Sequence, residues 1–568
     1  MEQEKKGSRL RKDHAMCFFL TALALGVRLY GIRYGLPLLL KADEPYIIDS
    51  AIGNFYSQDP IILGWPGSSL VLLLFVLYFP YYLYLKSSGV LSSVEDFIFM
   101  YWNDPSMLYL IGRVCVALAG ALTVLVLYRA CSKMYGKATA GLSSAFLAFS
   151  FMHVRHSHFA LPDIPMTLLL VMLVYLSYRI LEGTNIKTYV IAGALCGLCV
   201  SLKFNSAIIV MPIILAHLLR KSAPAKDDRW KITSLIACMI TFFYIGCPYV
   251  LTDPKAMIES IRNVVIWQKE IGNIRAIPTG SALAYLFDTV LPISTGWPMI
   301  IFSIIGFVTF LLKPDKKDLI VIVYPVTYVL LLSTSKTLFM RYAIPLIPFM
   351  ALLSALAITR LKEKIRYDLL STVVPIILSL LVLLPQVWKS ILFDHMLTHT
   401  DTRAVARKWI IEQLPAGSRI ILDHLPFSVP FGFNEWVLNY EKRDDRWGDL
   451  KYRYLDANSG KKVNSFKLMY TTGEVSDGIW DFEPDYVIVS SYVKNIFSGR
   501  MGETLKEKKG MIFKRRRAFY ERVEDEGKLL MTFSPSGTNE EEEDDIYGVA
   551  INPDPGPVIK IYRMGEFE

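Results

Sequence analysis

The sequence predicts a polytopic α-helical membrane protein of about 11 transmembrane helices, followed by a soluble α/β domain at the C-terminus. Three observations predict this class. Of 568 residues, 53% are hydrophobic, the mean hydropathy is +0.36, and apolar runs of span length stop near residue 390. The formal charge of +9 comes from Lys and Arg clustered in short connections between apolar runs, which is typical of cytoplasmic loops and not of a nucleic-acid groove. We therefore expect membrane lipids, and no nucleic acid, among the partners.

Apolar segments of roughly 20 residues define the predicted spans. They lie near 15–36, 109–130, 138–155, 164–181, 188–202, 205–219, 230–250, 294–313, 318–333, 339–359 and 368–389. The first segment follows a charged N-terminus, and no small-residue cleavage site comes after it. This indicates an uncleaved signal-anchor with a cytoplasmic N-terminus. An odd number of spans then places the C-terminal domain outside.

Loop charges test this topology, because Lys and Arg concentrate in cytoplasmic loops. Basic connections fall on alternate, predicted inner sides at 129–137, 179–187, 220–229, 313–317 and 360–366. A full crossing by the apolar stretch 68–85 would invert every later loop. We interpret that stretch, which is rich in tyrosine, as re-entrant or interfacial. The run 188–219 is either one long helix or two short helices that meet at Lys203, and only two helices keep the loop after it inside.

Charged residues from distant parts of the chain then share the outer face. They are Asp43 with Glu44, Asp163, Lys203, and Lys336 with Arg341. Charges beside a bilayer are expensive and mark functional sites. Cations bind phosphate, and a carboxylate can remove the proton of an attacking acceptor, so this set favours transfer of a group carried on a phosphorylated lipid. Snorkelling at helix ends is the alternative for each cation taken alone.

At these residues the chain resembles the GT-C superfamily of polyprenyl-phosphate-sugar glycosyltransferases, in the branch of protein O-mannosyltransferases and the aminoarabinose transferase of lipid A. The similar segments are "ADEPYIIDSA", "HVRHSHFALPDIPMTLL", "GALCGLCVSLKFNSAIIVMP", "MRYAIPLIPFMAL" and "DTRAVARKWIIEQLPAGSRIIL". The resemblance implies a GT-C fold. It also implies inverting transfer of a sugar from an undecaprenyl- or dolichyl-phosphate donor to a protein, lipid or glycan acceptor. One departure is "GWPGSSL", with only Pro66 where the family often has a Pro-Pro pair.

The resemblance also assigns roles. Asp43 matches the catalytic carboxylate, which acts as base, and Asp163 completes the acidic site. Glu44 has a supporting role, because neighbours in a helix or strand do not share a face. Independently of the resemblance, the outer-face cations Lys203, Lys336 and Arg341 are candidates for binding the donor phosphate. Arg155 is a further candidate, the alternative being a surface charge. His158 and Asp163 are candidate ligands for a divalent cation, the alternative being histidines that bond phosphate or loop backbone.

Residues 1–390 form the predicted catalytic membrane domain, with external loops near 37–108, 156–163 and 251–293. The last of these loops is either a lid or an amphipathic interfacial helix. Residues 391–568 form the outer α/β domain, which carries no hydrolase or kinase motif and is expected to recognise the acceptor or cover the catalytic face. Its "KRRR" at 514–517 could contact anionic lipid or glycan phosphate, but we interpret it as solvated surface. We expect a plasma membrane location, in a bacterial or archaeal inner membrane.

Two other function classes stay open. A lipid or solute transporter would use membrane-edge carboxylates as a proton relay, although the chain shows no inverted repeat. A binding or scaffold protein on the same fold would not bring the acidic positions together. Cys196 and Cys199 form a CxxC inside an apolar run, where small thiols usually pack, so we expect no redox role.

Overall fold

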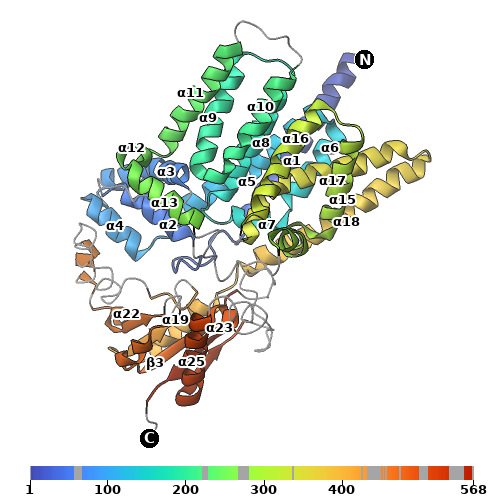
Figure 1. Ribbon diagram of the computed structural model, residues 1–568. Coiled ribbons are helices and arrows are strands. Elements are labelled where there is room, and N and C mark those ends of the chain that lie inside the picture. The colour runs from blue at the N-terminus through green and yellow to red at the C-terminus, as the bar shows by residue number, and fades with distance from the viewer. Residues whose placement is uncertain are drawn as a thin grey trace. The chain divides into compact units, whose positions relative to one another are not determined.

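The structure is a computed structural model that describes residues 2–41, 43–56, 67–220, 228–266, 281–335, 338–423, 427–431, 450–451, 453–454, 457–458, 460–471, 475–497, 510–535 and 555–565. The chain divides into two compact units. The first comprises Met1–Ile32, Pro60–Tyr78 and Ile111–Asp394, and the second comprises Arg33–Asp59, Phe79–Leu110 and His395–Glu568. Figure 1 shows both units with many of their elements labelled.

The first unit is helical. Its elements, some of which extend into the second unit, are α1 (Glu2–Leu29), α3 (Ser68–Ser87), α5 (Ser106–Met134), α6 (Lys137–Ala148), α7 (Phe151–Ser157), α8 (Asp163–Leu181), α9 (Ile186–Leu202), η1 (Phe204–Ile209), α10 (Val210–Leu219), α11 (Asp228–Gly246), α12 (Tyr249–Thr252), α13 (Pro254–Ile266), α14 (Ala282–Tyr285), η3 (Leu286–Val290), α15 (Leu291–Leu312), α16 (Lys316–Ser333), η4 (Met340–Leu346), α17 (Ile347–Lys364) and α18 (Asp368–Met396).

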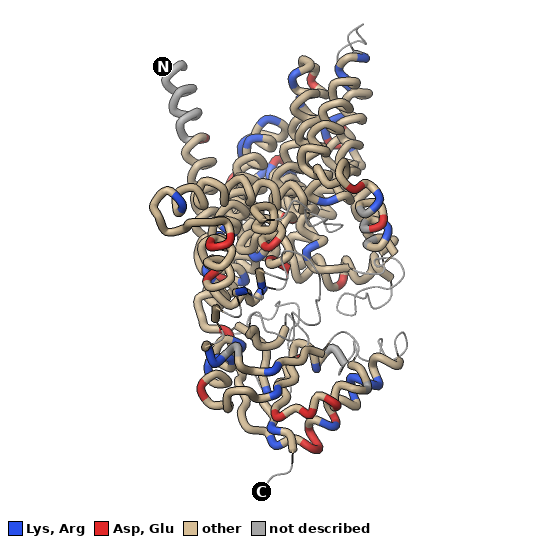
Figure 2. The backbone as a smooth tube through the Cα atoms, turned by 90° about the vertical axis from the view of Figure 1, so that its left-hand side faces the viewer, with Lys and Arg blue, Asp and Glu red and all other residues tan. Residues whose placement is uncertain are grey.

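Every predicted span contains helix. Among the described residues, six helical segments are long and apolar enough to cross a membrane: Ser68–Ser87, Ser106–Met134, Asp163–Leu181, Ala282–Leu312, Met340–Lys364 and Asp368–Met396. In each segment a stretch of 18 residues holds at most two charged residues, and most of the helical tube in Figure 2 is tan. The protein is therefore an integral membrane protein, and the number of its crossings stays a prediction.

Basic connections of this unit meet at one end of its helices. Tyr135, which follows α5, donates a hydrogen bond to Asp318 in the first turn of α16 (3.0 Å). Lys316 Nζ donates to the carbonyl of Leu219, the last residue of α10 (3.0 Å). These contacts bring together three of the connections that the loop charges assign to the same side. Which side faces the cytoplasm stays a prediction.

The run 188–219 consists of two helices, as the loop charges predict. α9 ends at Leu202, Lys203 has an extended backbone (φ −154°, ψ 122°), and η1 leads into α10. The two helices return side by side, because Tyr189 near the start of α9 bonds His217 near the end of α10 (2.8 Å). Lys203 therefore lies at the end of the helices opposite the basic connections.

α9 also packs closely against α11, and the two run in the same direction. A Cβ added to Gly193 would lie 2.3 Å from the carbonyl oxygen of Leu235, and one added to Gly197 would lie 2.3 Å from that of Met239. Only glycine allows the two backbones to come this close. The cysteine beside Gly197, Cys196, is a free, buried thiol, and Cys199 is another.

Helix α3 has the length and composition of a span, but its contacts lie at the end of the first unit's helices where Lys203 is found. Ser69, near its start, donates a hydrogen bond to the carbonyl of Leu198, about one turn before the end of α9 (3.4 Å). Further along, Leu74 and Tyr78 lie within 4 Å of the place that a Cβ of Gly112 would take, in the second turn of α5. A helix that crosses the membrane would change its depth in the bilayer by roughly 13 Å over the nine residues between Ser69 and Tyr78. Both residues instead contact the same end of the neighbouring helices. The contacts therefore favour the interfacial interpretation.

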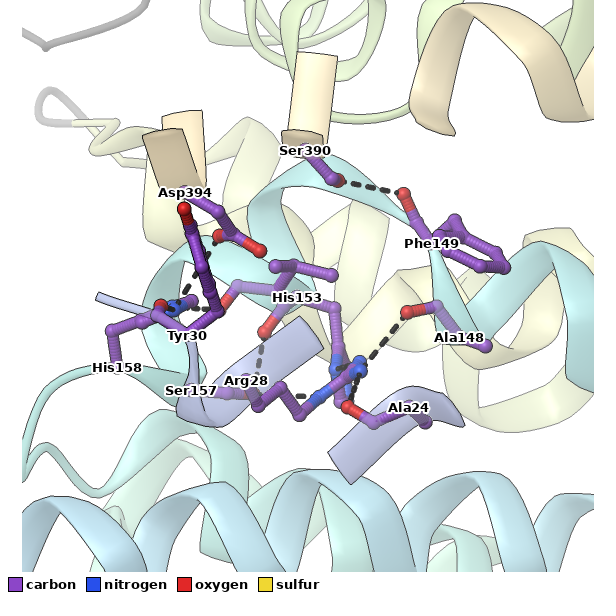
Figure 3. Close-up of polar contacts among 11 residues, drawn as sticks. Ala24, Arg28, Tyr30, Ala148, Phe149, His153, Ser157, His158, Ser390 and Asp394 are labelled. Atoms are coloured by element: carbon purple, nitrogen blue, oxygen red, sulfur yellow. Dashed lines mark hydrogen bonds and ion pairs between the residues drawn. The ribbon is translucent and has the colours of Figure 1, made fainter. Parts of the chain in front are cut away.

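The predicted span 138–155 is not one continuous helix. α6 and α7 are separated by a short break, so that backbone groups there lose their helical partners. Two side chains of α18 supply replacements: Gln386 accepts from the Phe151 amide (3.0 Å), and Ser390 donates to the Phe149 carbonyl (3.0 Å). Figure 3 shows the second of these bonds. Non-helical backbone at membrane depth needs such partners.

Within the predicted loop 251–293, the structure forms α13. Met257 on this helix is buried, and Ile258 and Val265 are exposed, so it presents apolar side chains outward. The loop therefore contains a helix at Pro254–Ile266, and residues 267–280 lie outside the described residues. Whether the loop is a lid or an interfacial segment stays open.

The second unit contains a five-stranded sheet in the order β2-β1-β3-β5-β4. β1 (Arg419–Leu422) is parallel to β2 (Lys467–Tyr470) and β3 (Tyr486–Ser490), whereas β5 (Ile559–Arg563) is antiparallel to β3 and β4 (Lys528–Phe533). Side chains alternate along β1, so that Ile420 and Leu422 pack with α19 (Thr402–Gln413) while Ile421 packs with α25 (Gly510–Glu526). The predicted α/β character is confirmed. The remaining described elements are α2 (Glu44–Gly53), α4 (Val94–Asn103), α22 (Lys462–Ser465), η5 (Asp477–Phe482) and α23 (Ser491–Phe497).

The interpretation of 514–517 as solvated surface is wrong for Arg516. This side chain is 1% exposed and donates to Asp423, just after β1 (3.0 Å). Its neighbour Arg517 is exposed and bonds Glu521 (2.7 Å). Arg516 belongs to the helical stripe of buried positions that packs on the sheet, and a run of four basic letters conceals that periodicity.

Candidate functional site

The first unit brings Asp163 and Lys203 together. Asp163 begins α8, Lys203 follows the last residue of α9, and Lys203 Nζ lies 2.5 Å from Asp163 Oδ1. Both residues are buried, at 2% and 8% exposure. Two charges of the predicted outer face, 40 residues apart in the chain, therefore form one ion pair. The first turn of a helix also favours the negative charge of Asp163.

The segment η4 joins the same end of the unit. Lys203 Nζ lies 5.6 Å from the centroid of the Tyr342 ring, a cation–π geometry. Arg341, the preceding residue, is half-buried, and its guanidinium lies 4.7 Å from the Phe339 ring. Lys336, the other predicted cation of this segment, lies outside the described residues.

A buried polar network that the sequence did not indicate lies near the C-terminal ends of α1 and α18 and along α7 (Figure 3). Arg28, fully buried in the last turn of α1, donates to the carbonyl of Ala148 (2.9 Å) and to Ser157 Oγ (3.2 Å), and contacts His153 Nδ1 (2.9 Å). The carbonyl of Ala148 ends α6, so the guanidinium neutralises the negative end of that helix. Arg28 therefore stabilises the break between α6 and α7.

The candidate metal ligands contact different partners. His158 Nδ1 lies 3.0 Å from the Val154 carbonyl, and His158 Nε2 lies 3.0 Å from the Tyr30 carbonyl and 3.4 Å from Asp394 Oδ1. Asp163 instead bonds the lysine described above. Within the described ranges, no three His, Cys, Asp or Glu side chains gather as metal ligands.

Arg155, a candidate for the donor phosphate, is half-buried in α7. Its guanidinium lies 5.8 Å from the Phe393 ring of α18, and Nη1 lies 3.5 Å from His156 Nε2. These contacts place the arginine against α18, next to the polar network. The structure thus gives Arg155 aromatic and imidazole neighbours and gives Lys203 a carboxylate.

Asp43 and Glu44 belong to the second unit, at the start of α2. Asp43 is the half-buried N-cap residue, and Glu44 is fully buried in the first turn, followed by Pro45. Acidic residues are favoured at this end of a helix. The unequal burial separates the pair and leaves Asp43 as the more accessible carboxylate.

Comparison with known proteins gives two kinds of match. A family model described as dolichyl-phosphate-mannose-protein mannosyltransferase matches residues 110–245, the segment that holds Asp163 and Lys203. No curated protein matches the chain in sequence.

Solved structures match nearly the whole chain. The oligosaccharyltransferase of Archaeoglobus fulgidus in the apo form has a TM-score of 0.50 and 11% identity, over 97% of this chain and 88% of its own. ArnT from Cupriavidus metallidurans in the apo state has a TM-score of 0.50 and 12% identity, over 96% and 97%. The chain therefore has the GT-C fold that its sequence resemblance implies.

Proposed function

We propose that this protein is an inverting glycosyltransferase that moves a sugar from an undecaprenyl- or dolichyl-phosphate donor to a protein, lipid or glycan acceptor. The observation that carries the proposal is the buried Asp163–Lys203 pair inside the segment that matches the mannosyltransferase family model. The two structural relatives with this fold are named as an oligosaccharyltransferase and as ArnT. These matches favour a transferase over a transporter with a carboxylate relay.

In the proposed reaction Asp43 is the base. Its carboxylate takes the acceptor's proton as the acceptor attacks the anomeric carbon, while the bond from that carbon to the phosphate oxygen breaks. The polyprenyl phosphate leaves with the bonding electrons. Phosphate is an adequate leaving group, so no strong general acid is required. Attack on the face opposite the leaving group inverts the configuration.

The donor phosphate is assigned to the cations at the Asp163 end. An ammonium carries three N–H donors, so Lys203 can donate to Asp163 and also to a phosphate oxygen. Asp163 then holds the lysine in place, and Arg341 would add a planar, forked donor. Lys336 and Arg155 complete the proposed set, and Glu44 supports Asp43 at the start of α2.

We place the active face outside the plasma membrane, with the N-terminus in the cytoplasm and the C-terminal domain outside, as expected of a bacterial or archaeal inner membrane. The support is the meeting of the basic connections at the opposite end of the first unit. Single-cysteine labelling tests this orientation. The cysteine of Lys187→Cys should react with a membrane-impermeant thiol reagent only after the membrane is permeabilised.

The function is tested by mass spectrometry of glycans, envelope lipids and proteins from cells that carry the wild-type gene, no gene, or the Asp43→Asn variant. We expect one sugar mass to disappear from one acceptor class in both altered strains. Unchanged sugar content without the gene would contradict the proposal. Repeating the transfer reaction with a chelator tests whether a divalent cation takes part.

A further inference from the structure

We propose that α4 couples the C-terminal domain to α2, the helix whose N-terminus carries Asp43, and thereby sets the position of that carboxylate. Tyr101 and Glu95 are then positioning residues. The consequence for catalysis rests on the proposed function, whereas the contacts of α4 stand by themselves. All of these contacts lie within the second unit.

α4 has a well-defined start and two distinct faces. Ser93 Oγ accepts a hydrogen bond from the Asp96 amide (3.1 Å), and Asp96 Oδ2 accepts one from the Ser93 amide (2.8 Å). This capping box fixes the first turn. Positions 95, 99 and 102 recur on one side of the helix, and positions 97 and 101 recur on another.

The first face makes polar contacts with the C-terminal domain. Arg453 donates two hydrogen bonds to Glu95, Nη1 to Oε2 and Nη2 to Oε1, both 2.9 Å long. Lys461 Nζ lies 3.2 Å from Asn103 Oδ1. An exposed ion pair adds little stability, but the forked geometry specifies orientation.

An aromatic contact completes this face. The Tyr454 ring stands edge-on to Phe99 and Trp102, with centroids 5.6 and 5.3 Å away. The Tyr454 hydroxyl donates to Asn103 Oδ1 (3.1 Å). Such ring pairs stabilise a contact beyond the area they bury. Arg453, Tyr454 and Lys461 of the C-terminal domain are therefore docked on α4.

The second face of α4 holds α2. Phe97 is fully buried, and its ring centroid lies 5.1 Å from that of Phe55, just beyond α2, and 5.4 Å from that of Tyr82 in α3. Tyr101 donates a hydrogen bond from its hydroxyl to Asp49 in the middle of α2. α2 is thus fixed to α4 at its middle and at its end.

A movement of α4 is therefore passed to Asp43. α2 has ten residues, roughly 15 Å of helix, and behaves as a short rod. Asp49 lies six residues after Asp43, so a shift at Asp49 changes the place of the N-cap carboxylate. A misplacement of about 1 Å in a reacting group can cost about 100-fold in rate.

Charge reversal tests the coupling in the full-length protein. Glu95→Arg and Arg453→Glu are each expected to lower kcat for sugar transfer about 10-fold, with the donor KM unchanged, and the double variant should recover wild-type kcat. Glu483→Arg is the matched control, because it breaks the exposed Arg419–Glu483 pair (2.8 Å) without touching α4. Tyr101→Phe removes a hydroxyl alone and should also lower kcat. A double variant as slow as the single variants, or single variants as fast as wild type, would overturn the proposal.

A second measurement does not depend on activity. Hydrogen exchange of the amides of α2 should become faster in Glu95→Arg, return to the wild-type rate in the double variant, and stay unchanged in Glu483→Arg. Unchanged exchange in Glu95→Arg would overturn the coupling even if the protein transfers sugar. Absence of transfer by the wild-type protein, together with the expected exchange pattern, would instead overturn the proposed function alone.

Discussion

Lys203 Nζ lies 2.5 Å from Asp163 Oδ1, and this buried pair connects the end of α9 to the start of α8. The helix break at Lys203 divides an apolar run into α9 and the η1–α10 segment, and the carboxylate of Asp163 neutralises the lysine. A buried charge that loses its partner is strongly destabilising. The pair therefore serves both the local fold and the proposed binding of phosphate.

The first prediction concerns this pair. Lys203→Met leaves Asp163 buried without a cation, so we expect a loss of about 3–5 kcal/mol in the free energy of unfolding, together with loss of donor binding. The control is Lys187→Met, which removes an exposed lysine from the first turn of α9. Thermal unfolding in detergent compares the two, and equal melting temperatures would contradict this prediction.

A second prediction separates two neighbouring arginines of α25. Arg516→Met removes the cation from the buried Asp423, which keeps hydrogen bonds from Thr471, Tyr520 and the Ser490 amide. Burial raises the pKa of Asp423 and the charge of Arg516 lowers it, so loss of the arginine should destabilise the protein by about 3–5 kcal/mol. Arg517→Met breaks an exposed pair and should change stability by less than about 0.5 kcal/mol. Limited proteolysis of the full chain measures both. Similar cleavage rates for the two variants would contradict the conclusion that Arg516 and Asp423 form a buried ion pair.

The third prediction uses Asp401, the N-cap residue of α19. Asp401 accepts hydrogen bonds from Tyr34 (2.6 Å) and from Arg403 Nε and Nη2 (2.9 and 2.8 Å). Burial alone would raise the pKa of this carboxyl, but the charge and hydrogen bonds of Arg403 outweigh it and hold the pKa of Asp401 below its usual value. A depressed pKa makes the folded state favour the ionised form.

The sign of the pH effect follows. The stabilising contribution is complete above the unfolded pKa of about 3.9 and is lost as pH falls through the lower folded pKa. Asp401→Asn should therefore lower the melting temperature at pH 7, and its difference from wild type should shrink below about pH 4. Melting curves between pH 7 and pH 3 check this. A difference that stays constant over that range would show that the carboxylate charge contributes nothing.

Loop charges predicted the break at Lys203. The tendency of Lys and Arg to lie in cytoplasmic loops can be applied to each connection from its own local sequence. The break between α6 and α7 could not be predicted in that way. Its partners, Arg28, Gln386 and Ser390, come from helices far away in the chain, and the run around Phe149 carries no proline or glycine. Tertiary contacts decide such a feature, and a single sequence does not display them.

The sequence also predicted only part of the candidate site. Asp163 and Lys203 were assigned to one face from separate signals, and the structure joins them directly. The docking of Arg453 on Glu95 was invisible, since an exposed charge has no distinctive pattern until its partner is known. The role of Asp43 stays a prediction from the acidic motif, and Lys336 lies outside the described residues.

The role of Asp43 is tested most directly by sugar transfer in proteoliposomes that contain a polyprenyl-phosphate-sugar donor and a membrane extract as acceptor. Wild type is compared with Asp43→Asn and with Glu44→Gln, the matched neighbour. We predict that Asp43→Asn lowers kcat by about 10²–10⁴-fold while donor binding and thermal unfolding are retained, and that Glu44→Gln has a smaller effect. Normal turnover by Asp43→Asn would contradict the assignment of Asp43 as the base.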